Sequence, residues 1–167
     1  MSGNIFVFTG DGKGKTTAAI GMALRAAGHG KKVVIIQFLK KGMYGEIKAL
    51  KEMENIEIYQ FGKKEFVFEP DEENFELARN ALEFAKTKLH EKPFMLILDE
   101  VNVALFMGLL SIDDISSLLK NRGDTHMVLT GRNAPQKLID LADVATEMKK
   151  VKHYYDTGKE AESGLEY

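Results

Sequence analysis

The sequence predicts an α/β fold in which helices cover both faces of a mostly parallel β-sheet. Short apolar runs alternate with helical patterns along the chain, as they do where buried parallel strands are joined by helices. The first apolar run also leads through a glycine-rich turn directly into a helical pattern. Because 167 residues suit one compact domain, we expect residues 1–167 to form a single domain.

The first half of the chain predicts strands and a helix in alternation. The apolar run Ile5–Phe8 is a strand, and the alanine-rich segment Thr16–Ala27 is a helix that glycines at positions 28 and 30 bring to an end. The segment Lys32–Leu39 contains four consecutive β-branched residues, which indicates a buried strand. A weaker strand is expected at Ile56–Gln60.

The second half continues the alternation. The segment Glu72–His90 predicts a long amphipathic helix, because its apolar residues recur at spacings of three and four: Phe75, Ala78, Leu82, Ala85 and Leu89. The remaining expected elements are the strand Phe94–Leu98, the helix Ile112–Lys120, the strand Met127–Leu129, the helix Pro135–Leu141 and a last core strand at Val144–Met148. Ligands of such sheets bind beyond the carboxyl ends of the strands, so the chemistry is expected just after Phe8, Phe38, Leu98 and Leu129.

Composition excludes several classes of protein. The formal net charge is -2, without the basic excess that a general nucleic-acid binder usually has. There are no cysteines, which excludes disulfides and thiolate metal sites and fits a reducing cytoplasm. No apolar stretch approaches the roughly 20 residues of a membrane helix, and no signal peptide fits the first residues. The four histidines are scattered without metal-ligand spacing.

The turn after the first strand has the composition of a phosphate-binding loop. It reads Gly10, Asp11, Gly12, Lys13, Gly14, Lys15, Thr16 and Thr17. Glycines let backbone N–H groups surround phosphate oxygens, and the following helix N-terminus favours an anion. Lys15 adds a full charge and the Thr16 hydroxyl can bind magnesium. Thr9 stands where the common pattern has glycine. A dinucleotide site would need a third glycine where Lys15 or Thr17 stands, so that alternative is rejected.

Two carboxylates follow the predicted strand Phe94–Leu98. In a P-loop NTPase (RecA-like) fold, carboxylates at such a strand end hold magnesium or orient a nucleophile. Since successive strand residues point to opposite sides, we expect only one of Asp99 and Glu100 to face the phosphates. The alternative is a polar strand-to-helix junction capped by Asp99. Asn102 is expected near the same opening of the site, at the end of this strand.

Several stretches together resemble the P-loop family of corrinoid adenosyltransferases, which act in cobalamin biosynthesis and salvage. The stretches that carry the resemblance are Thr9–Ala19 with Arg25–Gly30, Gln37-Phe38, Leu98–Leu105, Leu129–Pro135, Ala142–Met148, Lys152-His153 and Gly164–Tyr167. The resemblance covers nearly the whole chain and is thinnest across Lys40–Lys88. In this family a Co(I) corrinoid attacks the ribose C5′ of ATP and triphosphate leaves.

The resemblance implies a role for particular residues. Gly10–Thr17 would bind phosphates, and Lys15, Thr16 and Glu100 would stabilise the leaving triphosphate. Thr16 and Glu100 would also ligate Mg²⁺ or Mn²⁺. Arg25, Arg132 and Asn102 would contact the nucleotide. Phe66 and Phe68 would pack against the corrinoid, although many relatives have Trp where Phe68 stands; a satellite hydrophobic cluster is the alternative for both rings.

The resemblance also implies partners. These are the corrinoid, an electron donor such as a flavoprotein reductase, and a second copy of the chain in a homodimer, with no nucleic acid and no membrane. Some relatives cover a neighbouring active site with an N-terminal extension, whereas the first strand predicted here begins at Ile5. Two other functions stay open from the sequence: a P-loop small-molecule kinase or ATPase, and a nucleotide-dependent module that delivers a cofactor.

Overall fold

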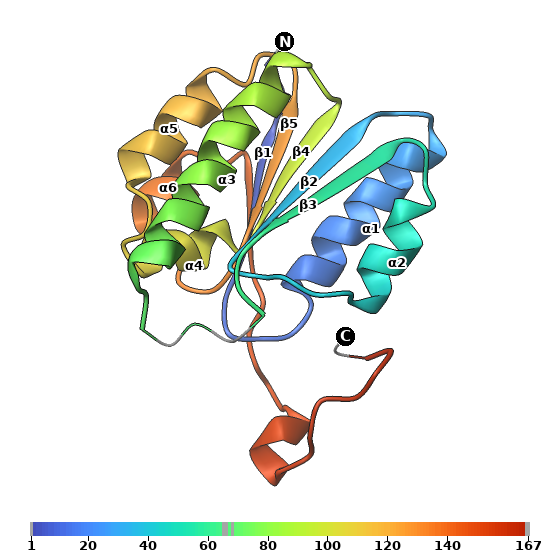
Figure 1. Ribbon diagram of the computed structural model, residues 1–167, viewed down its shortest axis with the longest axis vertical. Helices are drawn as coiled ribbons and strands as arrows, with labels where there is room; N and C mark the ends of the chain where they lie inside the picture. The colour runs from blue at the N-terminus through green and yellow to red at the C-terminus, as the bar shows by residue number, and fades with distance from the viewer. Residues whose placement is uncertain (1, 65–66, 68, 166–167) are drawn as a thin grey trace.

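A six-stranded parallel sheet forms the centre of the computed structural model, which describes residues 2–64, 67 and 69–165 (Figure 1). The strand order is β3-β2-β4-β5-β1-β6, and all neighbouring pairs are parallel. The strands are β1 (Ile5–Thr9), β2 (Val33–Phe38), β3 (Ile56–Phe61), β4 (Met95–Asp99), β5 (His126–Thr130) and β6 (Val144–Glu147). The predicted α/β fold is therefore confirmed.

Helices cover both faces of the sheet (Figure 1). They are α1 (Lys15–Gly28), α2 (Gly45–Lys51), α3 (Glu72–His90), α4 (Val101–Phe106), α5 (Ile112–Lys120) and α6 (Gln136–Asp140), followed by the short 3-10 helix η1 (Tyr154–Thr157). Figure 1 shows α1 and α2 on one face and the other four α-helices on the opposite face.

The core is divided between these two faces because strand side chains alternate. In β2, Val34 and Ile36 pack with residues of α3, α4 and α5. Their neighbours Val33 and Ile35 pack with the alanines of α1. Each face of β2 is therefore covered, which explains why this strand is fully buried and entirely apolar up to Gln37.

Three local expectations differ from the structure. Helices α2 and α4 were not anticipated, because they contain only 7 and 6 residues and show little periodicity. The strand at the end of the chain exists, but its position in the core was wrong. All residues of β6 are exposed, since β6 lies at the sheet edge beside β1. Phe75 of α3 is also 42% exposed, whereas the other four predicted core residues of that helix are buried.

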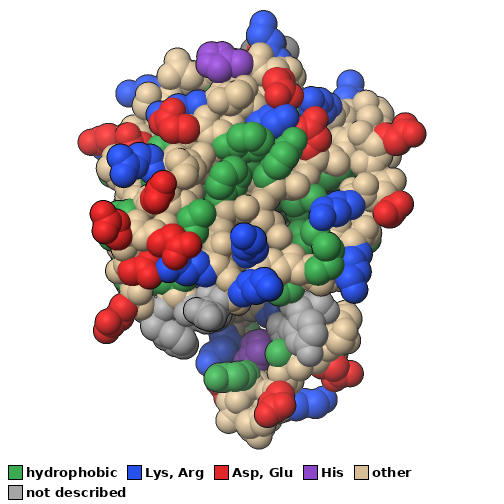
Figure 2. Space-filling model, in the orientation of Figure 1, with side chains coloured by type: hydrophobic (Ala, Val, Ile, Leu, Met, Phe, Trp, Pro, Cys, Tyr) green, Lys and Arg blue, Asp and Glu red, His purple; other side chains and the backbone are tan. Residues whose placement is uncertain are grey.

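Charged side chains of both signs occur on the surface of the protein. On the face that Figure 2 shows, acidic and basic side chains are mixed, in agreement with the net charge of -2. Within the described residues, no helix is long and apolar enough to cross a membrane.

Candidate functional site

A pocket of about 750 Å³ lies at the carboxyl edge of the sheet, where the loops after β1, β2, β4 and β5 meet. This is the edge at which parallel sheets bind ligands, and the volume is within the range of small-molecule sites. Its polar lining is Asp11–Thr17, Lys40, Glu46, Glu100, Arg132, Asn133 and His153, and its apolar lining includes Ile20, Leu39, Val67, Val103, Phe106, Met107 and Leu165.

The loop between β1 and α1 is held in place by the segment that follows β6. The Gly12 N–H donates to the Met148 carbonyl oxygen at 2.7 Å, and the Met148 N–H donates to the Thr9 carbonyl oxygen at 2.8 Å. A Cβ atom on Gly10 or Gly12 would lie 2.5 or 2.7 Å from the Met148 carbonyl oxygen. Only glycine allows this close backbone approach, so Met148, which follows β6, fixes the backbone position of Gly10 and Gly12.

The Lys15 ammonium lies inside this loop. It donates to the carbonyl oxygens of Gly10 at 2.6 Å and Gly12 at 2.7 Å, and the residue is only 9% exposed. Burial lowers the pKa of Lys15, and the negative charge of Glu100 partly opposes that shift. The positive charge is thus held inside the loop by hydrogen bonds to two backbone carbonyl oxygens.

Asp99, at the end of β4, is the centre of a buried hydrogen-bond network. Its Oδ1 accepts from the hydroxyls of Thr16 at 2.8 Å and Thr130 at 2.6 Å. Its Oδ2 accepts from the Gln37 amide at 3.0 Å. The Gln37 Oε1 in turn accepts from the Gln60 amide at 2.9 Å, and the Gln60 Oε1 accepts from a backbone N–H at Gly42. Three strand ends are joined through one carboxylate.

Glu100 turns back towards the same side as Asp99. It has a left-handed backbone, with φ 63°, and its N–H donates to the Thr130 hydroxyl at 3.0 Å. Of the two carboxylates, only Glu100 lines the pocket, whereas Asp99 is buried and contacts the Thr16 hydroxyl. The expectation that only one of them faces the phosphates agrees with this lining and stays a prediction.

The oxygen donors at this point suit a hard divalent cation. Burial raises the pKa of the Glu100 carboxyl, and the nearby Lys40 ammonium counteracts the shift. Lys40 lies 3.3 Å from Asp99 Oδ2 and 3.7 Å from Glu100 Oε1, so these oxygens already surround a positive charge. Carboxylate and hydroxyl oxygens are the ligands that Mg²⁺ prefers. Among the described residues, no group of three or more His, Cys, Asp or Glu could hold a metal. A cation here would therefore need further ligands such as phosphate oxygens.

Two buried polar groups position the loop that carries Arg132. The Thr9 hydroxyl accepts from the Ala134 N–H at 3.1 Å. The Asn102 amide donates to the carbonyl oxygens of Phe8 at 3.2 Å and Gly131 at 3.1 Å. Thr9, the departure from the common P-loop pattern, thus has a structural role. Asn102 is fully buried behind the loop and does not line the pocket, so its contact with nucleotide stays a prediction.

The other predicted residues divide into three groups. Arg132 and Asp11–Thr17 line the pocket with Glu100. Arg25 is exposed in the last turn of α1, about 15 Å from Lys15 at 1.5 Å of helix rise per residue. It does not line the pocket. Phe66 and Phe68 lie outside the described residues.

Sequence reasoning missed Lys40, Gln37 and Thr130 as parts of this site. A signal existed for Lys40, because it follows the carboxyl end of β2, where parallel sheets bind ligands. Gln37 gave a weaker signal, an amide inside an otherwise apolar strand.

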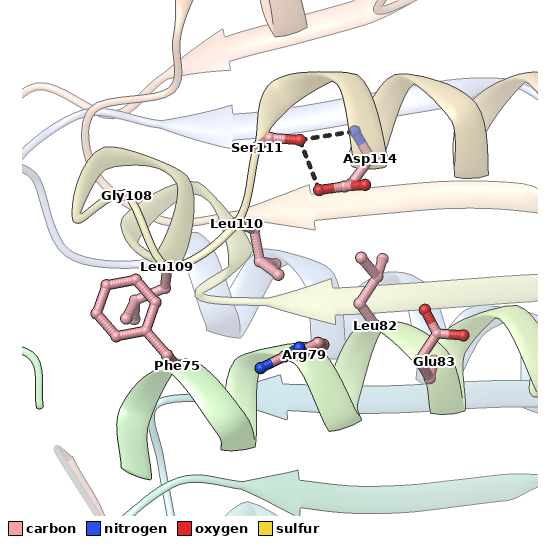
Figure 3. A pocket seen from close by; sticks show the side chains of 9 residues that line it. All are labelled: Phe75, Arg79, Leu82, Glu83, Gly108, Leu109, Leu110, Ser111 and Asp114. Carbon is pink, nitrogen blue, oxygen red and sulfur yellow. Dashed lines mark hydrogen bonds between the residues drawn. The ribbon is translucent and has the colours of Figure 1, made fainter. Parts of the chain in front are cut away.

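A second cavity of about 370 Å³ lies between α3 and the segment joining α4 to α5 (Figure 3). Its apolar lining consists of Phe75, Leu82, Leu109 and Leu110. Ser111 caps α5 by accepting from the Asp114 N–H. None of the predicted site residues contributes to it.

Comparison with known proteins agrees with the P-loop pocket. The family model described as "ATP:corrinoid adenosyltransferase BtuR/CobO/CobP" matches residues 1–167. A corrinoid adenosyltransferase of Sinorhizobium sp is 37% identical over 99% of this chain and 80% of the relative. The Escherichia coli (strain K12) corrinoid adenosyltransferase is 35% identical over 99% of this chain and 86% of the relative. The Salmonella typhimurium enzyme, named corrinoid adenosyltransferase CobA, is 36% identical over the same shares. The chain therefore belongs to the ATP:corrinoid adenosyltransferase family.

Proposed function

We propose that this family member transfers the 5′-deoxyadenosyl group of ATP to the cobalt of a reduced Co(I) corrinoid and releases triphosphate. The observation that carries the proposal is one pocket whose lining combines a glycine-rich loop and four cationic side chains with a group of apolar residues. The cations are Lys13, Lys15, Lys40 and Arg132, and the apolar residues include Leu39, Val103, Phe106 and Met107. The charged residues suit the triphosphate, and the apolar residues suit the adenosyl group and the corrinoid.

The phosphate loop would hold the leaving group. Apart from the Gly12 N–H, which donates to the Met148 carbonyl oxygen, the backbone N–H groups of Gly10–Thr17 and the N-terminus of α1 favour an anion. On binding, the Lys15 ammonium would exchange the carbonyl oxygens of Gly10 and Gly12 for phosphate oxygens. Arg132, from the loop after β5, would also contact the nucleotide. These charges act most strongly on triphosphate as it leaves, when its charge is greatest.

The proposed step requires no general base. The cobalt electron pair forms the Co–C5′ bond, the C5′–O bond breaks, and its electron pair stays on the α-phosphate oxygen. Thr16 and Glu100 would hold Mg²⁺ or Mn²⁺, which supplies further positive charge to that oxygen when bound. Asp99 would orient Thr16 through their hydrogen bond of 2.8 Å.

The remaining assignments concern substrates and partners. We propose that Phe66 and Phe68 contact the corrinoid, next to the pocket residue Val67. Arg25 is remote from the pocket of its own chain, so it would reach a nucleotide only in a homodimer. Co(I) must be regenerated by an electron donor such as a flavoprotein reductase, which fits an activity in the cytoplasm.

The test is an anaerobic assay with ATP, Mg²⁺ and chemically reduced cobalamin, repeated with cobinamide and with cobyrinic acid a,c-diamide. The corrinoid spectrum and the phosphate products are followed together. A light-sensitive alkylcorrinoid that appears with equimolar triphosphate is the expected result. A kinase or ATPase would release ADP, and a delivery module would release nothing; either outcome with all three corrinoids overturns the proposal.

Lys15→Met tests the site within this assay. Loss of hydrogen bonds from a charged group should weaken ATP binding by about 10–100-fold. The matched control is Lys120→Met, which removes one exposed lysine of α5 outside the pocket. Equal ATP affinity of the two variants would contradict the assigned phosphate loop.

A further inference from the structure

The Lys40 ammonium lies between the three side chains that gather at the proposed metal position. Its Nζ is 3.3 Å from Asp99 Oδ2, 3.7 Å from Glu100 Oε1 and 3.5 Å from the Thr16 hydroxyl oxygen. The side chain is 28% exposed, whereas that of Asp99 is 2% exposed. One ammonium thus lies beside two carboxylates, and water hardly reaches the carboxylate of Asp99.

The backbone holds Lys40 at this point. The preceding residue, Leu39, has φ 57° and turns the chain sharply at the end of β2. Gly62, after β3, packs so closely that a Cβ atom there would lie 2.2 Å from the backbone nitrogen of Lys40. The Gly42 N–H donates to the Gln60 side chain at 3.2 Å. Two neighbouring strands therefore fix the start of this side chain, and only its flexible end can move.

A lysine ammonium that lies beside two carboxylates carries its positive charge. A divalent cation bound to Thr16 and Glu100 would lie beside this ammonium and be repelled by it. The metal and the ammonium therefore compete for the same oxygens.

We infer that Lys40 fills the cation position of the nucleotide-free protein and makes metal binding depend on nucleotide. Phosphate oxygens would provide the missing metal ligands and a second anion to which the Lys40 ammonium can turn, since Lys40 also lines the pocket. Mg²⁺ thus enters with ATP and not before it. This inference rests on the proposed function, because it takes Thr16 and Glu100 as the metal ligands.

The first test measures Mn²⁺ binding without nucleotide, by electron paramagnetic resonance of free Mn²⁺. Lys40→Met, which keeps the chain length and removes the charge, should bind Mn²⁺ about tenfold more tightly than the native chain. Lys40→Arg should not. The control is Lys41→Met, which removes the neighbouring exposed lysine. Mn²⁺ affinities of native chain and Lys40→Met within about twofold of each other would overturn the inference.

Two further measurements test the inference independently of the Lys40→Met variant. Lys40→Met can lose stability, so the native chain is also followed by ¹⁵N NMR of the lysine ammonium groups, with Lys40 assigned from Lys40→Arg. The Lys40 signal should shift with MgATP and stay unchanged with Mg²⁺ alone; a shift with Mg²⁺ alone would contradict the inference.

Glu100→Gln distinguishes a failure of the proposed metal site from a failure of the inference about Lys40. If Mn²⁺ binding in the presence of ATP survives Glu100→Gln unchanged, the proposed metal site itself is wrong. If Glu100→Gln abolishes that binding while Lys40→Met does not change Mn²⁺ binding without nucleotide, the metal site is retained and only the competition between Lys40 and the metal is wrong.

Discussion

Replacing Asp99 by asparagine should destabilise the protein far more than its small change in shape suggests. Each carboxylate oxygen accepts two hydrogen bonds: Oδ1 from Thr16 and Thr130, and Oδ2 from Gln37 and Lys40. Asp99→Asn removes the negative charge from all four of these hydrogen bonds and breaks the buried ion pair with Lys40. Its NH₂ group must also face either Gln37 and Lys40, which donate, or the two threonine hydroxyls, which would have to turn and accept from it.

We therefore expect Asp99→Asn to lower the free energy of unfolding by about 3–5 kcal/mol, the usual cost of breaking a buried ion pair. For a domain of this size the corresponding fall in melting temperature is roughly 10 °C. Urea unfolding followed by far-UV circular dichroism measures the difference directly.

Glu100→Gln provides the matched control for this substitution. The Glu100 side chain is 24% exposed and has one long contact with Lys40 at 3.7 Å, so its loss should cost less than about 1 kcal/mol. If Asp99→Asn also costs less than about 1 kcal/mol, Asp99 is not the buried acceptor of four donors that we describe, and the reasoning fails.

Two further substitutions test the phosphate loop and the outer edge of the sheet. Gly12→Ala places a Cβ atom 2.7 Å from a backbone carbonyl oxygen and should cost about 1–3 kcal/mol. Gly21→Ala in α1 has no atom within 4 Å and should stabilise by up to about 1 kcal/mol; thermal melts that shift in the same direction would contradict this pair. Hydrogen bonds from Lys32 and then Lys88 lower the pKa of Glu57 to about 2. This stabilisation is present above the ordinary pKa of 4.5 and is lost as the pH falls towards 2. Glu57→Gln should therefore cost about 1 kcal/mol at neutral pH, less than the full shift because the side chain is partly exposed. The difference in unfolding free energy between the native chain and Glu57→Gln, measured by urea titration, should vanish as the pH approaches 2. A difference that does not change with pH would refute the ion pairs assigned to Glu57.

Much of the fold could be predicted because its signals are local. The β-branched run in β2 and the regular apolar spacing in α3 each identify an element without reference to the rest of the chain. The position of β6 could not be predicted in this way. Its sequence contains Val144 and Ala145, but whether they are buried depends on where the strand joins the sheet, which is a property of the whole topology.

The site was predictable where one short motif contains both the turn and the chemistry. The loop that carries Lys15 and Thr16 is such a motif. Glu100 was selected, but its orientation was not, because the left-handed backbone that turns it depends on the packing after β4. Lys40 was missed because its partners Asp99 and Glu100 lie about 60 positions away and meet it only when β2 and β4 pair. Asn102 shows the opposite case, in which a residue near the motif in sequence is fully buried behind the loop.

The amide network beneath Asp99 has a consequence for how the chain can change. Gln37 uses its NH₂ group for Asp99 and its oxygen for Gln60, so its orientation is fixed by both partners at once. An apolar residue in place of Gln60 would leave the buried amide oxygen of Gln37 without a donor. An apolar residue in place of Gln37 would leave the Gln60 NH₂ group without this acceptor. Substitutions at these two positions should therefore be coupled: the double substitution should cost less than the sum of the two single ones, although it still removes the Gln37 donor from Asp99. Among relatives, the residues that pair across β2 and β3 at this point are expected to vary as a unit.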